Sequence, residues 1–469
     1  MALLRDSKQT RWAMLLAVAF LMFATYICSD NIFSVETLLK APVPEAGAAL
    51  DGQAAERGYA VTDVEYGNLA GAYSIFNVYL LMLIFGGLIL DKMGIRFTGI
   101  MSSLLMVVGI AVTCFSFYQL RDLLDSGAEI PMVSLLGEKL RLPIFQAVMG
   151  IGIFGVGAEI AGITVTKVIA KWFLGYELAL AMGLQLALAR LGTGLAFGVT
   201  PFVVTWTGGN VGLAILIGLC ILTLGFIVFV IYTVFDKKLD DQLKATGTAQ
   251  EGESAEEEFH FKDILEVFKN PAFWMIAVLC LLFYAAVNPF LKYSTGMMVD
   301  KFQMSQEQAG LFPMILPMGC IVLTPLFGGI YDKKGHGADL MIIGAVIITV
   351  VHLLFSAPFV NQAWEAVILM VMLGVGFAML PSAMWPSIAK IMPAKLLGTT
   401  MALTFYIQNI GFLFVPKIIS SIKESTNNNY TLVMFFFAGL GIVALLISLG
   451  VKLLDKKKHY GLQLPNIKK

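Results

Sequence analysis

Two oppositely charged side chains interrupt long apolar segments of the sequence. Glu159 lies in the run GIFGVGAEIAGITVTK, and Arg190 lies in the apolar run that follows it. A charge at the centre of a bilayer costs about 2.5–3.5 kcal/mol on insertion scales, so such residues are usually functional. Glu159 precedes Lys171 by twelve residues and Arg190 follows Leu178 by twelve. At 1.5 Å per residue both lie about 18 Å from the same boundary, so we expect them to pair at one depth.

Other polar and aromatic side chains in apolar segments could complete a binding site. The stretch VNPF (287–290) contains a proline that is expected to break its helix and free backbone carbonyls. Arg190 could hold a carboxylate by two parallel hydrogen bonds, while Glu159, with Asp30 as a second candidate, could hold an amine. The candidate binding residues are Glu159, Arg190, Asp30, Asn31, Tyr26, Tyr284, Asn288, Lys292, Trp385, Gln408 and Asn409.

The elements that position these residues are membrane helices. Of the 469 residues, 58% are hydrophobic and only 14% are charged, against about 25% charged in soluble domains. Twelve apolar stretches of about 20 residues predict an all-α membrane protein with twelve transmembrane helices. Basic residues number 21 in the segments on the side of the termini and 7 in the opposite loops, so both termini are expected in the cytoplasm.

The chain divides into two similar halves. The motif Gly-x-x-x-Asp-x-x-Gly recurs 241 residues further on, and a later offset of 219 maps Arg190 onto Asn409 and Glu159 onto Ala378. The expected organisation is an N-terminal six-helix bundle (1–235), a cytoplasmic linker with a short interfacial helix (236–270), a C-terminal six-helix bundle (271–453) and a cytoplasmic tail (454–469). The charged residues Glu159 and Arg190 therefore belong to the first half, and the matching positions in the second half are neutral.

The repeated motif is expected to form a gate at the cytoplasmic ends of the helices. Its glycines allow a tight turn, and its aspartate can accept hydrogen bonds from the amino end of a neighbouring helix. The motif continues with Arg96 in the first copy but with His336 and Gly337 in the second, which is therefore degenerate. The candidate gating residues are Gly87, Asp91, Gly94, Arg96, Gly328, Asp332 and Gly335.

A duplicated six-helix unit with this motif resembles the major facilitator superfamily. The runs YICSDN, GIGIFGVGAE, KWFLGYELALAMGLQLALARLG, FYAAVNPF and AMWPSIAKIMPAKLLGTTMALTFYIQNIG are similar to those of its lysosomal dipeptide transporters, the domain-containing protein 1 type. The resemblance implies the major facilitator fold as two pseudo-symmetric bundles. It also implies uniport of dipeptides, a peptide cavity that includes Glu159 and Arg190, and a possible accessory membrane subunit.

Several functional alternatives stay open. The expected function is alternating-access transport of dipeptides or similar zwitterions by uniport or proton-linked movement; the alternatives are an anion antiporter of the nitrate or oxalate kind and a non-transporting membrane sensor or scaffold. No nucleophile–base pair, metal-ligand spacing or phosphate loop is evident in the sequence, so we expect no enzyme, metal, cofactor or nucleic-acid partner. No dileucine sorting signal is evident near the N-terminus, which favours a bacterial inner membrane over a lysosomal membrane.

Overall fold

The protein is a bundle of long membrane helices. The structure, a computed structural model, describes residues 3–43, 58–173, 176–245, 261–393, 396–426 and 429–465. Among these residues, eleven helices are long and apolar enough to span a membrane, and a bent pair, Asp63–Tyr79 with Met82–Leu90, makes a twelfth if it is counted as one span. The predicted all-α membrane fold is confirmed.

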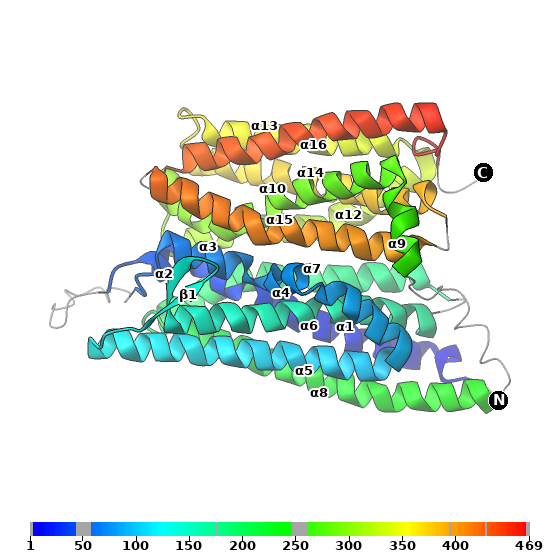
Figure 1. Cartoon of the computed structure of the whole chain (residues 1–469), viewed down its shortest axis with the longest axis horizontal. Helices are drawn as coiled ribbons and strands as arrows, with labels where there is room; N and C mark the ends of the chain where they lie inside the picture. The colour runs from blue at the N-terminus through cyan, green and yellow to red at the C-terminus, as the bar shows by residue number, and fades with distance from the viewer. Residues whose placement is uncertain are drawn as a thin grey trace.

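The first half packs in the lower part of Figure 1. Long helix α1 contacts α6, α7 and α8, and α5 contacts α6 and α8. The elements of this half are η1 (Leu4–Asp6), α1 (Lys8–Asp30), η2 (Asn31–Val35), α2 (Glu36–Lys40), α3 (Asp63–Gly71), η3 (Ala72–Ser74), α4 (Ile75–Tyr79), α5 (Met82–Ser126), β1 (Met132–Leu135), β2 (Glu138–Arg141), α6 (Leu142–Trp172), α7 (Leu178–Trp206) and α8 (Val211–Ala245).

The second half lies above the first in the same view. Helix α13 contacts α14 and α16, while α10 contacts α15 and α16. Its elements are α9 (Phe261–Phe268), α10 (Pro271–Phe302), α11 (Gln306–Leu311), α12 (Ile315–Lys334), α13 (Gly337–Ser356), α14 (Ala363–Ile391), α15 (Leu397–Ser425) and α16 (Tyr430–Lys458). Helix α9 falls within the predicted linker, as expected for a short helix there, whereas residues 246–260 of that linker lie outside the described residues.

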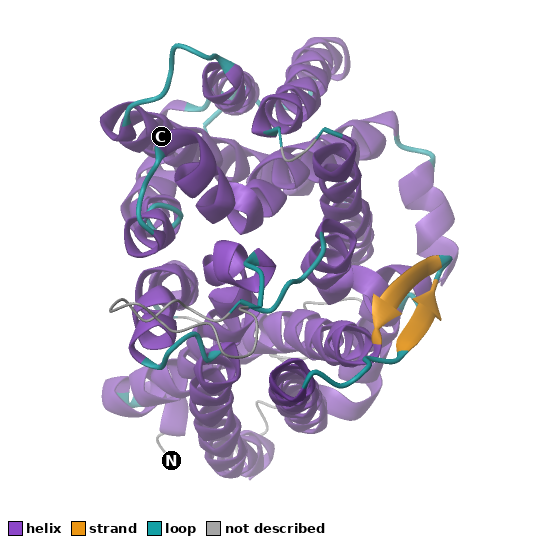
Figure 2. Ribbon diagram, turned by 90° about the vertical axis from the view of Figure 1, so that its left-hand side faces the viewer, coloured by secondary structure: helices purple, strands orange, loops and turns teal. Residues whose placement is uncertain are grey.

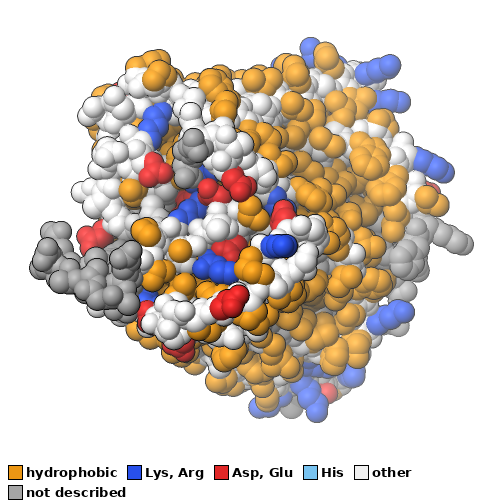
Figure 3. Space-filling view, turned by 60° about the vertical axis from the view of Figure 1, so that its left-hand side comes forward, with side chains coloured by type: hydrophobic (Ala, Val, Ile, Leu, Met, Phe, Trp, Pro, Cys, Tyr) orange, Lys and Arg blue, Asp and Glu red, His pale blue; other side chains and the backbone are white. Residues whose placement is uncertain are grey.

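Both termini lie at one end of the bundle, which we call the terminal end (Figure 1). The opposite end, which we call the hairpin end, carries the antiparallel pair β1–β2, in which Met132 pairs with Arg141. Figure 2 looks onto this end and shows the hairpin at the rim of the bundle. The sequence analysis did not foresee these strands. Apolar side chains form a broad belt over the flank between the two ends (Figure 3), as a bilayer-facing surface requires.

Two helices differ from their expected course. The predicted break at VNPF is wrong, because α10 continues through Pro289. His352 Nε2 donates to the Ala286 carbonyl over 3.0 Å, so one carbonyl near the proline has a side-chain partner. The second span, in contrast, bends by 60° without a proline. Leu81 adopts a left-handed φ of 54° there, and the Val78 carbonyl accepts from Tyr406 of the second half over 3.3 Å.

The halves are joined near the hairpin end by a contact that we call the seam, formed by α3 with α15 and α10. Helix α3 lies along α15, and the Tyr66 ring packs edge-on against Tyr293 of α10 with 5.0 Å between centroids. Gly71 lets the two helices meet closely, because a Cβ there would stand 2.6 Å from the Leu413 carbonyl oxygen. Small residues at helix interfaces commonly permit such backbone contact in membranes.

A buried group of charges reinforces the seam. Glu36 of α2 accepts from Lys40 Nζ at 2.9 Å and from Lys423 Nζ of α15 at 3.3 Å. The Gly296 amide of α10 also donates to Glu36, over 3.1 Å, and Asp63 accepts from Lys40 at 2.5 Å. The side chains of Glu36 and Lys423 are only 1% and 2% exposed. Removing one partner from such a group leaves a buried charge unpaired, so these contacts favour closure of the hairpin end.

The terminal end is packed differently around the gate motifs. A Cβ added at Gly87, Gly94, Gly328 or Gly398 would meet no described atom within 4 Å. The hydrogen bonds between Thr37 and Gln306, between Ser74 and Asn409, and between Lys417 and Glu138 all join the halves at or beyond the bundle centre, toward the hairpin end. The conformation is therefore one in which the hairpin end is closed.

The seam generates a prediction for Gly71. Gly71→Ala should prevent α3 and α15 from closing, because its new methyl group would press on backbone that cannot rotate away. We expect a cysteine placed at the hairpin end of α15 to react faster with a membrane-impermeant maleimide in this variant than in the wild type. Gly439→Ala on α16 is the matched control, since a Cβ there meets nothing within 4 Å. Equal labelling of the two variants would contradict a tight seam.

Candidate functional site

A central cavity of about 370 Å³ lies between the halves. Helices α1, α6 and α7 of the first half and α10, α14 and α15 of the second contribute its walls. Nine of the eleven candidate binding residues line it, namely Tyr26, Asp30, Glu159, Arg190, Tyr284, Asn288, Lys292, Trp385 and Gln408. Asn409 is fully buried next to it, whereas Asn31 is buried away from its walls.

Glu159 reaches the cavity because α6 packs closely on η3. A Cβ at Gly155, one turn before Glu159, would stand 1.9 Å from the Tyr73 carbonyl oxygen, so only glycine permits this approach. Glu159 Oε1 accepts a hydrogen bond from Asn409 Nδ2 of α15 over 3.3 Å. Asn409 Oδ1 in turn accepts from Ser74 over 2.6 Å. The glycine-rich run around Glu159 therefore serves close helix packing, and its carboxylate is already linked to the second half.

Arg190 reaches the cavity from α7 in a similar way. A Cβ at Gly192 would stand 2.4 Å from the Phe23 carbonyl oxygen, so α7 lies close against α1. The guanidinium carbon of Arg190 lies 5.4 Å from the ring centroid of Phe377 in the second half, which is cation–π range. The Arg190 side chain also lines the cavity.

The expected ion pair between Glu159 and Arg190 is wrong for this conformation. Among the ion pairs of the described residues, with a limit of 4.0 Å, none joins these two side chains. Equal depth on neighbouring helices does not fix which way the side chains turn: Glu159 turns to Asn409, and Arg190 lies over Phe377. The two charges thus stand in one cavity without neutralising each other directly.

Lys292 and Asp30 add a second pair of charges. Lys292 Nζ donates to the Ala70 carbonyl of α3 over 2.7 Å and lies 4.1 Å from the Phe33 ring centroid. Asp30 lines the same cavity as Lys292 and Arg190. Asp30 thus shares the cavity with both cations, while Glu159 hydrogen-bonds to Asn409.

Aromatic side chains form the wall on the second half. Trp385 Nε1 donates to the Tyr284 hydroxyl over 3.1 Å, and the Trp385 ring stacks on Phe405 with 4.7 Å between centroids. Gln408 on α15 also lines this wall and is 7% exposed. Tyr284, Trp385 and Gln408, all candidate binding residues, therefore lie together on this wall.

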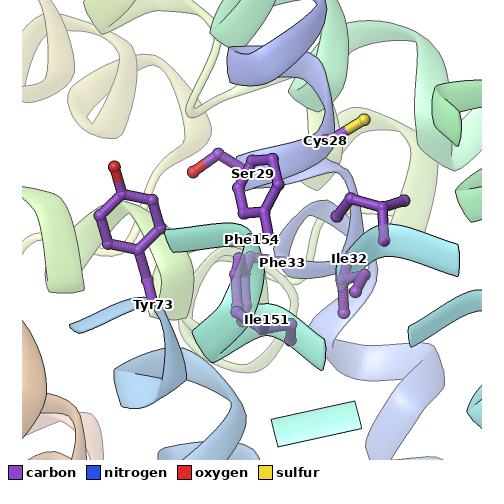
Figure 4. A pocket seen from close by; sticks show the side chains of 8 residues that line it. Cys28, Ser29, Ile32, Phe33, Tyr73, Ile151 and Phe154 are labelled. Atoms are coloured by element: carbon purple, nitrogen blue, oxygen red, sulfur yellow. The ribbon is translucent and has the colours of Figure 1, made fainter. Parts of the chain in front are cut away.

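The sequence analysis did not single out several polar lining residues. Thr25 and Ser29 share a helical face with Tyr26, while Gln185 and Thr193 fall five and three residues from Arg190. Helical spacing from the charged residues could have found them. Beyond the cavity, Ser29 and Tyr73 also line a small pocket whose other walls include Phe33, Ile151 and Phe154. Figure 4 shows Ser29 between Tyr73 and these apolar side chains.

The first gate motif lies beside a charge network at the terminal end. Arg96 pairs with Asp236 at 3.0 Å and with Asp240. Lys171 binds Asp236 at 2.9 Å, and the Trp172 indole donates to the same carboxylate over 3.2 Å. The network joins α5, α6 and α8 within the first half. The side chain of Asp91 lies outside the described residues.

The second gate motif holds the C-terminal segment, which the sequence analysis took for a plain tail. The amides of His336 and Gly337 donate to the carbonyls of Gln463 and Leu462, each over 3.0 Å. Lys390 of α14 donates to two more carbonyls of this segment, those of Gly461 and Leu464. A Cβ at Gly335 would stand 2.3 Å from the Gln463 oxygen, and Gly337 is similarly enclosed. The C-terminal segment thus docks at His336 and Gly337, the positions where the second copy departs from the motif.

The N-terminal segment holds the loop between α6 and α7 in the first half. Arg11 Nη2 donates to Glu177 over 2.9 Å, and the Arg11 guanidinium lies 4.0 Å from the Tyr176 ring centroid. The Tyr176 hydroxyl donates to Asp6 over 2.8 Å. In the run KWFLGYELALAMGLQLALARLG, Trp172 and Glu177 therefore make contacts that fix the terminal end.

No group of three or more potential metal ligands occurs among the described residues. Two six-helix halves around a central cavity with charges at membrane depth define a multi-pass membrane transporter. A model of the Major Facilitator Superfamily matches residues 14–416. The chain belongs to this superfamily.

Similar proteins with curated names share one description. The chain is 26% identical to the lysosomal dipeptide transporter MFSD1 of Danio rerio, over 97% of this chain and 89% of that protein. It is 26% identical to the Homo sapiens protein of the same name, over 94% and 85% of the two chains. The Gallus gallus protein is 30% identical over 63% of this chain and 66% of its own length. All three relatives are thus transporters by name.

Solved structures support the fold alone. A D-xylose–proton symporter superposes with a TM-score of 0.67 at 16% identity, covering 94% of this chain and 97% of its own. The inward-open xylose transporter XylE from E. coli gives 0.66 at 15% identity, covering 94% and 95%. A POT family transporter in complex with 5-aminolevulinic acid gives 0.64 at 12% identity, covering 94% and 96%.

The contact between Arg11 and Glu177 generates a prediction for pH dependence. The hydrogen bond from Arg11 lowers the pKa of the Glu177 carboxyl below its ordinary value of 4.5. A carboxyl whose pKa is lower in the folded state stabilises that state above its ordinary pKa, and the stabilisation is lost as the pH falls through the lowered value. Glu177→Gln should therefore melt at a lower temperature than the wild type at pH 7.

The difference in melting temperature between Glu177→Gln and the wild type should shrink as the pH falls below 4.5. Thermal unfolding of the detergent-solubilised proteins across this range measures it. Glu129→Gln, in an exposed loop, is the control and should melt like the wild type throughout. A difference that stays constant with pH would exclude Glu177 as the titrating group.

Proposed function

We propose that the protein transports dipeptides or closely similar zwitterions across a membrane by alternating closure of its two ends. One observation carries this proposal: a single cavity is lined by two cations, Arg190 and Lys292, with Asp30, and also by Glu159, whose carboxylate accepts a hydrogen bond from Asn409. The curated relatives named dipeptide transporters support the same substrate class.

A free dipeptide matches this distribution of charge. Its carboxylate would lie between Arg190 and Lys292, where a charge-assisted contact replaces water. Its ammonium group would lie against Glu159, and the Tyr284 and Gln408 side chains could accept or donate to the peptide unit between them. A cavity of about 370 Å³ is within the range of ligand pockets, about 300–1,000 Å³.

A small pocket next to the cavity limits which substrate side chains fit. The small pocket beyond Ser29 and Tyr73 has apolar walls, including Phe154 and Ile151 (Figure 4). A substrate residue that points this way would carry a small apolar side chain, because a larger one would collide with closely packed rings. Polar or large side chains would have to point along the open part of the cavity.

The seam at the hairpin end and the gate motifs at the terminal end would close in alternation. With both termini in the cytoplasm, as the basic residues indicate, the hairpin end is the outer end and this conformation is closed to the outside. The gate glycines would then approach the opposite half when the cytoplasmic end closes and the seam opens. Transport would proceed by uniport or with a coupled proton, and a bacterial inner membrane is our preferred setting.

The substrate class generates a prediction for blocked peptides. Blocking one terminus of dialanine should leave one buried charge of the cavity without its partner, a loss of roughly 2–5 kcal/mol by analogy with truncated buried charge pairs. The affinity should fall about 30-fold or more. The assay is counterflow of labelled dialanine into liposomes, competed by its N-acetylated and C-amidated forms.

The competitors also separate the alternatives. Equal competition by free and blocked dialanine would contradict the zwitterion proposal. Competition by oxalate or nitrate instead of dialanine would favour the anion antiporter, for which Arg190 and Lys292 would be the binding groups and Glu159 a repulsive one.

Arg190 generates a second prediction. Arg190→Gln keeps a polar side chain of moderate length but loses the charge and the paired donors. Because no ion pair ties Arg190 to Glu159 in this conformation, the variant should fold with a melting temperature close to that of the wild type. Dialanine should raise the melting temperature of the wild type and not that of the variant. A full ligand-induced rise in the variant would exclude Arg190 from substrate binding.

A further inference from the structure

Lys292 is the residue at which the cavity and the seam meet. Its side chain lines the cavity from α10, in the second half. Its amine donates to the Ala70 carbonyl of α3, in the first half, over 2.7 Å. The same amine stands 4.1 Å from the Phe33 ring centroid, also in the first half. One ammonium group thus faces the ligand site and ties the two halves together.

The backbone of Lys292 belongs to the seam as well. Its carbonyl accepts a hydrogen bond from the Tyr66 hydroxyl of α3. The Tyr66 ring packs edge-on against Tyr293, whose hydroxyl donates to the Pro416 carbonyl of α15 over 2.9 Å. Tyr66 therefore contributes to the seam without contacting the amine, and Lys292 forms the end of the seam that reaches the cavity.

The hydrogen bond to Ala70 is one that a ligand could replace. An ammonium group has three donors, and among the described residues the Ala70 carbonyl is its hydrogen-bond acceptor. A carboxylate is a stronger acceptor for an ammonium group than a neutral carbonyl, because both partners are charged. A substrate carboxylate that binds the amine of Lys292 more strongly than Asp30, the carboxylate that already lines the cavity, would therefore draw this amine away from the Ala70 carbonyl.

We propose that Lys292 couples occupancy of the cavity to release of the seam, an inference that rests on the proposed transport of zwitterions. The substrate carboxylate takes the amine from the Ala70 carbonyl, which removes one bond between α3 and α10 and favours opening of the hairpin end. A ligand shifts a conformational equilibrium only by its difference in affinity for the two states. Here the substrate carboxylate binds the Lys292 amine more strongly after the amine has left the Ala70 carbonyl. The substrate therefore favours the state in which the hairpin end is open.

The test uses a reporter cysteine in the seam. Ser420 of α15 is 3% exposed and faces Gly67 of α3, so Ser420→Cys should react with a membrane-impermeant maleimide only when the hairpin end opens. The exposed native Cys220 is replaced by serine in this background. Labelling rates are measured in liposomes with and without dialanine, and dialanine binding is followed separately by thermal shift.

Three proteins distinguish coupling from binding and from general loosening. In the reporter protein, labelling should be slow and dialanine should accelerate it. In Lys292→Met, labelling without ligand should rise about tenfold or more, as expected for loss of a hydrogen bond to a charged group, and dialanine should add nothing. In Tyr66→Phe, which weakens the seam but leaves the amine, labelling should rise and dialanine should still accelerate it. Lys292→Gln replaces Lys292→Met if that variant does not fold.

The outcomes separate the two proposals. If dialanine neither binds nor accelerates labelling of the reporter protein, the proposed function fails and the coupling falls with it. If the reporter protein responds but Lys292→Met labels slowly without ligand, Lys292 does not hold the seam and the coupling is overturned. It is equally overturned if dialanine still accelerates labelling of Lys292→Met, because another residue then carries the ligand signal.

Discussion

The cost of charge inside a membrane constrains every part of this structure. Glu159, Arg190, Asp30 and Lys292 stand at membrane depth, and each must keep a polar partner or access to water. The cavity supplies the water, while Asn409, Phe377 and Ala70 supply partners from the opposite half. Since these partners cross between the halves, the same interactions that make the charges tolerable also hold the hairpin end closed.

Closure at the hairpin end depends on backbone contact as much as on charge. Gly71 lets α3 meet α15, and the buried group around Glu36 and Lys423 lies further along the same contact. An apolar seam alone would gain little, because lipid tails are as apolar as the helix surface. Close packing together with buried hydrogen bonds gives the seam its strength. Because a Cβ added at Gly87, Gly94 or Gly328 at the terminal end would meet no described atom within 4 Å, the closed end of this conformation is the hairpin end.

The sequence predicted the helices, the duplication and most of the cavity because each depends on local pattern. Twelve apolar stretches and a repeated motif require no knowledge of side-chain direction, and charged residues at equal depth do converge on one cavity. It could not predict the partners, because rotation about a helix axis and side-chain rotamers are set by packing. Glu159 therefore meets Asn409 from a sequence distance of 250 residues, rather than Arg190 on the adjacent helix.

Two other errors have the same origin. Pro289 suggested a broken helix, yet neighbouring side chains, including His352, stabilise a continuous one. The loop before α6 carries no alternating apolar pattern strong enough to reveal β1 and β2, whose pairing is fixed by backbone hydrogen bonds. Local sequence rules describe what a segment prefers alone, whereas these segments take the form their neighbours allow.

The docked C-terminal segment makes the end of the chain part of the second half's architecture. Its carbonyls cap the amino end of α13 and hold Lys390 of α14, so the turn after α12 joins residues 336 and 337 to residues 463 and 462. Duplication supplied two equivalent turns, but among the residues that the structure describes only the second is covered by a docked segment. A fluorescent protein or purification tag joined directly after α16 would replace this segment with foreign backbone. Such a fusion protein lacks the contacts of the C-terminal segment. The gate turns of its two halves therefore resemble each other more closely than they do in the native chain.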